Sequence, residues 1–441
     1  MRPLFAPTQE ANSFTPRVLM MEAFQQAVSA VSAQAVLPSY VPAPPKGRTL
    51  VLGAGKAAAA MASVLEKNWR DSFAPEKFSG LVVTRYAHDV PTRVIEVVQS
   101  GHPMPDNNGE DAARRMLRMA GQLGKDDLLI QLMSGGASSL MSCPAEGLHL
   151  QDIRCVSRDL LNCGASIREM NIVRKHMSSI AGGRLAAAAF PAKIINLIIS
   201  DVPGDDPSVI GSGPTVGDSS TYADAEAVIE KYDIKLPPSV ARLFEEGHNE
   251  TIKPHDPRLQ SVETHIIANP QRALDAAADL VRHHGFSPLI LGHQIEGEAR
   301  EVAKVLKGIA FQITDHQQPL PAPAAIISGG ETTVTVKGDG KGGRNAEFLL
   351  ASAIEFKSHQ HIFALAADTD GIDGTEDNAG AILTPHSLNR AYKMGIDPQT
   401  YLNRNDGYGF FEQLGDLYIT GPTRTNVNDF RIILLTPHSA A

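Results

Sequence analysis

The feature that most constrains the fold is a repeated alternation of short apolar runs with helical patterns. Each apolar run has the length of a strand and ends near Gly, Ser, Asp or Pro, and a helical pattern follows most of them. Apolar strands that alternate with helices are typical of a mainly parallel sheet with helices on both faces. We therefore predict an α/β fold. The runs are TLVLGA, FSGLVV, VIEVVQS, LLIQLM, KIINLIIS, HIIA, SPLILG, AAIISGG and HIFALAAD.

The chain is long enough for two domains. Its 441 residues exceed the size of one ordinary hydrophobic core. The composition changes over residues 233–260, which are rich in proline and charge and have little apolar periodicity. We place the boundary there. We predict an N-terminal Rossmann-like domain over residues 1–245 and a C-terminal α/β domain over residues 246–441, each with a mainly parallel sheet and flanking helices.

Composition and charge exclude some classes of function. Aromatic residues make up 5% of the chain and the formal net charge is -9, which argues against binding along a nucleic acid backbone. A small anionic ligand stays possible, because a local pocket can be basic on an acidic protein. The expected partner is therefore a small molecule, and both a monomer and a dimer stay open.

Cysteine usage and hydropathy bear on location. Cys143, Cys155 and Cys163 lack CxxC spacing, and their odd, low count argues against a disulfide framework or a structural zinc site. The N-terminal segment has no apolar stretch like that of a signal peptide, and no run of about 18 apolar residues occurs. We expect a cytoplasmic protein that does not bind membranes.

A glycine-rich loop follows the first apolar run. Gly53-Ala-Gly55-Lys56-Ala-Ala matches the dinucleotide-binding pattern G-x-G-x-x-A. The next strand ends in Thr84-Arg85 where NAD binding needs an acidic residue, which disfavours NAD and leaves NADP open. Lys56 stands at the first helical turn, where a positive charge is unfavourable unless an anion offsets it. Lys56 is therefore either an anion ligand or an ordinary solvated lysine.

Two further loops have the composition of phosphate-binding turns. SGGASS at residues 134–139 follows a buried strand, and GSGPT at residues 211–215 lies in a long loop. Glycines and hydroxyl side chains at strand ends can form nests of N–H donors that suit phosphate. Tight turns with serine caps are the alternative.

Carboxylates gather in two loops. Asp201 lies just past a strand end, where it could act as a base or bind Mg²⁺, and Asp205 could do the same. The segment ADTDGIDGTEDNAGA, which contains Asp370, has the carboxylate density of an EF-hand but a misplaced glycine. Such carboxylates suit Mg²⁺ held jointly with substrate phosphates. Helix capping and turn chemistry are the alternative for any single aspartate.

A third glycine-rich stretch, KGDGKGG at residues 337–343, precedes Arg344. The glycines allow the backbone to approach a ligand closely, and an arginine presents a fork of donors that suits carboxylate or phosphate. A flexible hairpin with a surface arginine is the alternative.

Basic residues also gather on the predicted helix of residues 169–186. Arg174 and His176 lie on it, and for both we favour a solvated helix face.

The chain has no G-x-x-x-x-G-K-[ST] loop, protein-kinase motif set, G-x-S-x-G elbow or HExxH motif. Eight segments, taken together and in order, instead resemble the glycerate 2-kinase family with a C-terminal MOFRL domain. Some members of that family carry the label hydroxypyruvate reductase. The segments are VLGAGKAA, SGHPMPD, LMSGGASSLM, REMNIVRKHMSSIAGGRLA, SDVPGDDPSVIGSGPT, SGGETTVTVKGDGKGGRNAE, ADTDGIDGTEDNAGA and TGPTRTNVNDF.

The resemblance implies a two-domain α/β enzyme with its active site between the domains. It implies that MgATP and D-glycerate give 2-phosphoglycerate and ADP, so that ATP and Mg²⁺ are the expected cofactors. The lysine and arginine of the family map onto Lys56 and Arg344.

These assignments give each candidate residue an expected role. Lys56 and Arg344, from opposite domains, would stabilise charge on the γ-phosphoryl group or bind the glycerate carboxylate. Asp201 would orient or deprotonate the C2 hydroxyl, or hold Mg²⁺. The candidate metal ligands are Asp201, Asp205 and Asp370. The candidate phosphate-binding residues are Gly53, Gly55, Ser134, Gly135, Gly136, Ser138, Ser212, Gly213 and Thr215.

Two other functions stay open. An NADPH-dependent hydroxypyruvate reductase would use the loop at Gly53 and Gly55 together with Arg85. A non-catalytic sensor would bind a sugar acid or a nucleotide without turnover. Phosphorylation at C2 or C3, and the true phosphate donor, are also left open.

Overall fold

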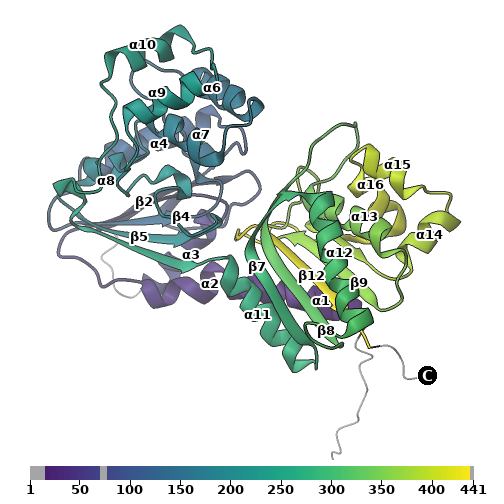
Figure 1. Cartoon of the computed structure of the whole chain (residues 1–441). Helices are drawn as coiled ribbons and strands as arrows, with labels where there is room; N and C mark the ends of the chain where they lie inside the picture. The colour runs from purple at the N-terminus through teal and green to yellow at the C-terminus, as the bar shows by residue number, and fades with distance from the viewer. Residues whose placement is uncertain (1–14, 70–76, 438–441) are drawn as a thin grey trace, which may run out of the picture. The chain divides into compact units, whose positions relative to one another are not determined.

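The protein is described by a computed structural model that covers residues 15–69 and 77–437 (Figure 1). These residues form two compact units. The first, which we call the N-terminal unit, comprises residues 28–272 and 422–428. The second, which we call the C-terminal unit, comprises residues 15–27, 273–421 and 429–437.

The N-terminal unit is built on a six-stranded sheet in the order β3-β2-β1-β4-β5-β6, and all five strand pairings are parallel. This is the strand order of doubly wound nucleotide-binding folds. One departure is that β2 runs into β3 through residues 86–94 without a helix. The strands are β1 (Thr49–Ala54), β2 (Phe78–Arg85), β3 (Ile95–Ser100), β4 (Leu128–Met133), β5 (Lys193–Ile199) and β6 (Val262–Ala268).

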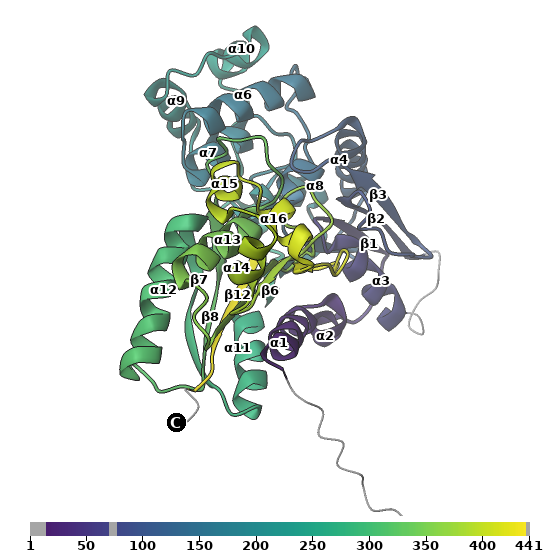
Figure 2. The ribbon, with the colours of Figure 1, turned by 90° about the vertical axis from the view of Figure 1, so that its right-hand side faces the viewer.

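Helices cover both faces of this sheet because its central strands are apolar on both sides. Every residue of β1 and β4 is buried. Leu50 and Leu52 share a core with α4 and α8, while α3 packs on the opposite face (Figures 1 and 2). The helices of this unit are α2 (Ala33–Val36), α3 (Ala58–Trp69), α4 (Asn107–Ala120), α5 (Ala137–Leu140), α6 (Leu150–Asn162), α7 (Ile167–His176), α8 (Arg184–Ala189), α9 (Tyr222–Lys231) and α10 (Pro238–Glu246).

Four of these helices, α6, α7, α9 and α10, form a separate layer with its own apolar core (Figure 1). Val156 and Leu160 of α6 meet Val173 of α7 and Val240 of α10 in this core. The start of α7 is fixed by a capping box, in which Ser166 and Glu169 each bond the other's backbone N–H. The sequence therefore sets the position of Arg174, two turns further along α7.

The C-terminal unit contains a second six-stranded sheet in the order β11-β10-β9-β12-β8-β7. Strands β7 and β8 are parallel, whereas the other four pairings are antiparallel. The strands are β7 (Ser287–Glu298), β8 (Ala324–Thr333), β9 (Ile362–Asp368), β10 (Gly380–Leu383), β11 (Leu417–Tyr418) and β12 (Asp429–Leu435).

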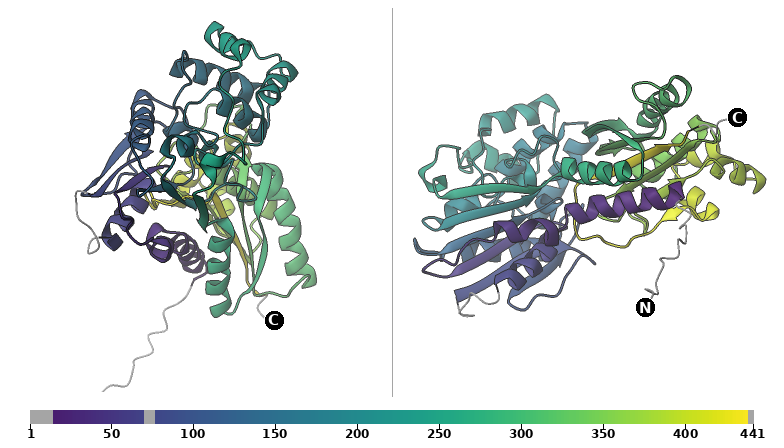
Figure 3. Two further views of the ribbon diagram at one scale, coloured as in Figure 1. Left: turned by 90° about the vertical axis from the view of Figure 1, so that its left-hand side faces the viewer. Right: turned by 90° about the horizontal axis from the view of Figure 1, so that it is seen from below.

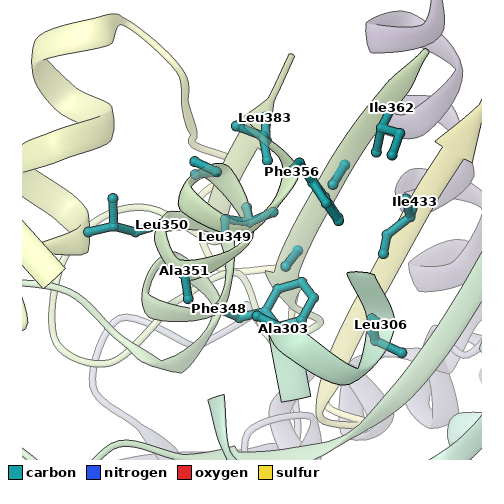
Figure 4. Close-up of a cluster of buried hydrophobic side chains, with 14 of the residues drawn as sticks. Ala303, Leu306, Phe348, Leu349, Leu350, Ala351, Phe356, Ile362, Leu383 and Ile433 are labelled. Atoms are coloured by element: carbon teal, nitrogen blue, oxygen red, sulfur yellow. The ribbon is translucent and has the colours of Figure 1, made fainter. Parts of the chain in front are cut away.

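One face of this second sheet carries the larger core (Figure 4). Phe348 and Phe356 of α13 and Leu306 of α12 pack against Ile433 of β12. On the other face, the ring of Phe24 in α1 contacts the ring of Phe430 in β12, and α1 lies beside α11 (Figure 3). The helices are α1 (Pro16–Ala30), α11 (Pro270–His283), α12 (Ala299–His316), α13 (Arg344–Phe356), α14 (Ser387–Lys393), α15 (Pro398–Asn403) and α16 (Gly407–Leu414).

The prediction of two α/β domains with flanking helices is confirmed, but two details differ. The boundary between the two units lies between residues 272 and 273 and not near residue 245. The reason is that β6 pairs with β5 and completes the first sheet. The second sheet is mixed and not mainly parallel, because β12 enters antiparallel between β8 and β9. An apolar run does not specify the direction of its strand, which explains the second difference.

Within residues 15–69 and 77–437, no helix is both long and apolar enough to cross a membrane. Cys143, Cys155 and Cys163 are unpaired.

Candidate active site

The parallel register of the first sheet brings three predicted loops together. Ala54 at the end of β1 pairs with Met133 at the end of β4, and Met133 pairs with Ile198 near the end of β5. The chain then continues into Lys56, into the loop of residues 134–139 and into Asp201. Carboxyl ends of parallel strands are where α/β proteins bind ligands.

The turn after β1 is bonded to the turn after β4. The Lys56 N–H donates to Gly135 O at 2.9 Å and the Ala57 N–H donates to Ser134 Oγ at 3.0 Å. A Cβ at Gly55 would lie 2.1 Å from Ser134 Oγ, and Gly55 has a φ of +131°. Gly55 therefore allows Ser134 to pack closely against the loop. The backbone N–H groups of Lys56 and Ala57 donate within the protein, so they are not available to a ligand. Gly53 similarly faces Leu132 O in the sheet.

This packing gives a stability prediction for Gly55→Ala. Overpacking and the left-handed φ together should lower the free energy of unfolding by about 3 kcal/mol. Gly164→Ala is the matched control, because Gly164 has a φ of +76° but no atom within 4 Å of its would-be Cβ. Urea denaturation should show a clearly smaller loss for the control, and equal losses in the two variants would contradict the role given to Ser134.

Lys56 is nearly buried and lies beside the loop of residues 134–139. It is 9% exposed, and a Cβ at Gly136 would lie 3.6 Å from Lys56 Cγ and 3.0 Å from His102 Nε2. Gly136 has a φ of +85°, which favours glycine. The alternative of a freely solvated lysine therefore does not hold.

Asp201 is fixed by two asparagines from the C-terminal end of the chain. Asn426 Nδ2 donates to Asp201 Oδ2 at 2.9 Å, and Asn428 Nδ2 donates to Asp201 O. A Cβ at Gly135 would lie 2.0 Å from both Asn426 Nδ2 and Asp201 Oδ2. Asn426 lies in the segment TGPTRTNVNDF, but the sequence indicates no role for it, because residues 422–428 are more than two hundred positions from Asp201.

Asp205 has an unsatisfied carboxylate oxygen. Its Oδ2 accepts from Asn269 Nδ2 at 2.7 Å, and its buried Oδ1 has no hydrogen-bond partner in the described chain. Such an oxygen fits a cation or a proton donor of a ligand. Among the described residues, no three His, Cys, Asp or Glu side chains form a group able to hold a metal ion.

The two serine loops meet. Ser138 Oγ lies 2.9 Å from Ser212 Oγ, and both side chains line a cavity of about 290 Å³. Ser212 has a φ of +62° between two glycines that are also left-handed. From Gly135 to Ser139, no backbone N–H donates to another group in the part of the chain that is described. This turn therefore offers open donors for an anion.

Two residues assigned to phosphate binding have internal positions. Thr215 is buried, and its hydroxyl donates to Gln131 Oε1 of β4. Gly213 O accepts from the Gly183 N–H at 2.8 Å, which fixes the loop to the start of α8. Thr215 and Gly213 thus hold the loop in place and do not line the cavity.

In the C-terminal unit, Arg344 is the first residue of α13 and is surrounded by carboxylates. Its Nε donates to Asp429 Oδ1 at 2.6 Å, Nη1 to Glu331 Oε1 at 2.7 Å and Nη2 to Asp368 Oδ2 at 2.9 Å. Burial opposes its charge, but the three carboxylates raise the pKa of Arg344 well above its usual value. It is not a surface arginine.

Asp429 is the centre of this cluster and was not identified from the sequence. It is 2% exposed and also accepts from Arg431, which is fully buried, and from Asn345 Nδ2 at 2.8 Å. Burial alone would raise the pKa of Asp429, but Arg344 and Arg431 hold it below its usual value. The cluster therefore contains two guanidinium groups, those of Arg344 and Arg431, and the three carboxylates that accept from Arg344.

The glycine stretch before Arg344 packs on the loop between α15 and α16. The N–H groups of Lys337 and Gly338 donate to Asn405 Oδ1, and the Lys341 N–H donates to Asp406 Oδ1. These amides are thus used inside the protein. Asp370 is buried and accepts from the Ile372 N–H at 2.8 Å.

Asp373 predicts a specific pH dependence of stability. Burial raises the pKa of Asp373 to about 6 from 3.8, against the N–H groups of Asn345 and Ala346. The folded state keeps this proton at a pH where the unfolded chain has lost it, so the contribution to stability falls as pH rises from about 4 to about 6. The wild type should lose about 3 kcal/mol relative to Asp373→Asn over this window.

Denaturation of both proteins at several pH values measures this difference. The asparagine side chain of the variant can change the free energy of unfolding by a constant amount at every pH. The test is therefore how the difference in unfolding free energy between the two proteins changes with pH. Asp377→Asn, at an exposed aspartate of the same loop, is the control for the change of side chain itself. A flat difference for Asp373→Asn would contradict the assignment.

Comparison with known families and structures matches both parts of the chain. The model of a domain of unknown function, DUF4147, matches residues 19–245, and the model of the MOFRL family matches residues 324–429. A D-glycerate 2-kinase of Thermotoga maritima is 40% identical over 422 residues, which cover 95% of this chain and 98% of that protein. The chain belongs to the glycerate 2-kinase family with a MOFRL domain.

The fold agrees with this membership. A crystal structure of glycerate kinase from Thermotoga maritima matches with a TM-score of 0.84 and 40% identity, over 95% of this chain and 99% of that one. A relative from Agrobacterium vitis with a provisional hydroxypyruvate reductase name is 48% identical, over 96% of this chain and 95% of that protein. Relatives of this chain thus carry the name glycerate 2-kinase or the name hydroxypyruvate reductase.

Proposed function

We propose that the protein is a glycerate 2-kinase, which transfers the γ-phosphoryl group of ATP to the C2 hydroxyl of D-glycerate. Relatives named glycerate 2-kinase or glycerate kinase match most of the chain. In the reaction the C2 oxygen forms a bond to the γ-phosphorus, the bond to the bridging oxygen breaks, and ADP leaves with that electron pair. The hydroxyl proton goes to a base.

One observation of the site carries this proposal. The amides that a dinucleotide pyrophosphate would need, at Lys56 and Ala57, donate to Gly135 O and Ser134 Oγ. The neighbouring amides from Gly135 to Ser139 have no acceptor among the described residues, and Lys56 lies beside them. Open donors next to a nearly buried cation suit a phosphate chain that enters over the β4 turn.

Asp201 is the proposed base. It lies at the end of β5, and Asn426 holds its carboxylate by Oδ2. An amide donor orients a carboxylate, which suits a base that takes the C2 proton. Lys56 would stabilise the charge that builds up on the transferred group.

Mg²⁺ would neutralise charge on the β- and γ-phosphates when it is bound with the nucleotide. The unsatisfied Oδ1 of Asp205 makes this residue the best-supported ligand in the N-terminal unit, with Asp201 as a second. Asp370 stays a candidate in the C-terminal unit, although its carboxylate already accepts from a backbone N–H.

The guanidinium of Arg344 has five N–H donors, and three of them donate to carboxylates. The other two would be available to an anionic substrate. The primary role of Arg344 in the C-terminal unit is to neutralise the cluster. Any contact with an anionic substrate would add to that role.

The second candidate, an NADPH-dependent hydroxypyruvate reductase, is favoured by the provisional names of the Agrobacterium vitis relatives. The engaged amides of the fingerprint loop count against it. Gly53 and Gly55 are explained by close packing on Leu132 and Ser134, without a pyrophosphate.

The test is an assay of both activities on one purified preparation. ADP release with D-glycerate and MgATP should be rapid and should require magnesium, while NADPH should not be oxidised in the presence of hydroxypyruvate. NADPH oxidation without ADP release would replace the proposal by the reductase. Binding of glycerate or ATP without either reaction would favour a sensor.

The unpaired cysteines are consistent with the cytoplasmic location that we propose.

A further inference from the structure

The cavity beside the serine loops is a defined part of the N-terminal unit. Its volume is about 290 Å³. It is lined by Ser138, Ser139 and Ser212 and also by Ile153 of α6 and Arg174 of α7. The serine loops and the helix that carries Arg174 were singled out from the sequence, although Arg174 was expected on a solvated face, whereas α6 was not.

The charge of the lining is positive. Arg154, Arg158 and Arg174 line the cavity, and no aspartate or glutamate does so among the described residues. Arg174 is half-buried, its Nε donates to Ser157 Oγ at 3.2 Å, and it forms no ion pair within the described chain. Burial lowers the pKa of Arg174 below its usual value. A poorly solvated cation without a carboxylate is costly unless an anionic ligand completes the site.

Much of the rest of the lining is apolar, although Ser142, Ser157 and Ser178 also belong to it, and the space is large. Met141, Leu161 and Ile180 contribute to it, with Ile153. The volume lies near the lower end, about 300 Å³, of pockets that hold drug-sized ligands. A three-carbon hydroxy acid would leave most of this space empty and has no face to match the apolar side chains. A nucleoside has both the size and an apolar ring face.

The cavity also lies on the route to Lys56. Ser138 belongs to the same turn as Gly136, whose backbone is next to the Lys56 side chain. Within residues 15–69 and 77–437, the backbone N–H groups from Gly135 to Ser139 have no acceptor, so they are open along this route. A polyphosphate that starts in the cavity could thus run along the turn and present its terminal phosphate to Lys56.

We propose that this cavity binds the nucleoside and the inner phosphates of ATP, with Arg174 as the cation that anchors them. The proposal rests on the proposed function in taking ATP as the phosphoryl donor. It leaves D-glycerate outside the cavity, on the Lys56 and Asp201 side of the turn.

Calorimetric titration with MgADP tests the assignment on the full-length protein. Arg174→Gln should raise the dissociation constant for MgADP, and the KM for ATP, by about tenfold or more, because a charged hydrogen bond to the anion is lost. The KM for D-glycerate should change by less than about twofold if Arg174 contacts only the nucleotide. Arg168→Gln, at an exposed position of α7 outside the cavity, should bind MgADP like the wild type.

A second pair of variants gives an answer even if Arg174→Gln does not fold. Leu161→Trp places an indole at the cavity and Asn162→Trp places one at the next, exposed position of α6. MgADP should change the fluorescence of the first variant and leave that of the second unchanged, with Trp69 common to both. An unchanged emission of Leu161→Trp at saturating MgADP would overturn the proposal.

The kinetic pattern separates this proposal from the proposed function. Arg174→Gln with normal MgADP affinity and a raised KM for D-glycerate would overturn the cavity assignment while the kinase activity stands. A wild-type protein that binds MgADP in the cavity but phosphorylates no hydroxy acid would overturn the kinase activity alone.

Discussion

Replacement of Lys56 by alanine is expected to lower kcat by at least about 100-fold, because a single charge contact to the transferred group is worth that much in a preorganised site. Lys56 is 9% exposed and lies beside Gly136, so its charge acts where water is scarce. The electrostatic interaction of a cation with an anionic group is stronger in such a position than in bulk solvent.

Glycerate and MgATP turnover at saturation, measured with circular dichroism as a check of folding, gives the result. Lys67→Ala is the matched control, because Lys67 lies on the same helix, α3, and is exposed. The control should keep its activity. A folded Lys56→Ala variant with turnover close to that of the wild type would show that Lys56 has no part in the transfer.

Replacement of Arg344 by alanine is expected to destabilise the C-terminal unit by about 3–5 kcal/mol, the usual cost of removing one partner of a buried ion pair. The variant leaves Asp429 and Asp368 with less compensation, and both are buried. Asp429 keeps Arg431, so the loss should not reach the sum of three separate ion pairs.

Chemical denaturation measures this effect directly. Arg404→Ala is the control, because Arg404 pairs with an exposed carboxylate, Asp339, and such pairs contribute little. Arg344→Lys should recover only part of the stability, since an ammonium group does not reproduce three fork-like contacts. A fully stable Arg344→Ala variant would mean that the cluster does not depend on this guanidinium.

The same result changes how Arg344 is to be interpreted in activity assays. An inactive Arg344→Ala variant could be inactive because the cluster around Asp429 has collapsed. A loss of turnover in Arg344→Lys that exceeds its loss of stability, measured well below its unfolding midpoint, would point to a direct contact with substrate.

Local patterns predicted much of the fold from the sequence. The apolar runs at β1, β4 and β5 became buried parallel strands, and Lys56 and Asp201 lie at their ends as expected. These positions follow from short-range rules, because a strand end and the loop after it are neighbours in the sequence. The order of the strands, by contrast, depends on pairing between distant segments.

What could not be predicted depends on long-range contacts. Thr215 looked like a phosphate ligand, but its hydroxyl turns inward to Gln131 of β4. Asn426 approaches Asp201 across more than two hundred residues, and Asp429 meets Arg344 only because β12 lies beside β9. Arg174 looked solvated because the sequence does not show that it lines one cavity with α6 and the serine loops. A local pattern names such residues but not their partners.

The most direct test of the central claim is the identity of the product made from D-glycerate and MgATP. Phosphorus NMR with proton coupling distinguishes a phosphate on the C2 carbon, coupled to one proton, from a phosphate on the C3 carbon, coupled to two. We predict 2-phosphoglycerate, formed in equal amount with ADP. A 3-phosphoglycerate product, or no phosphorylated product while NADPH is consumed with hydroxypyruvate, would contradict the account.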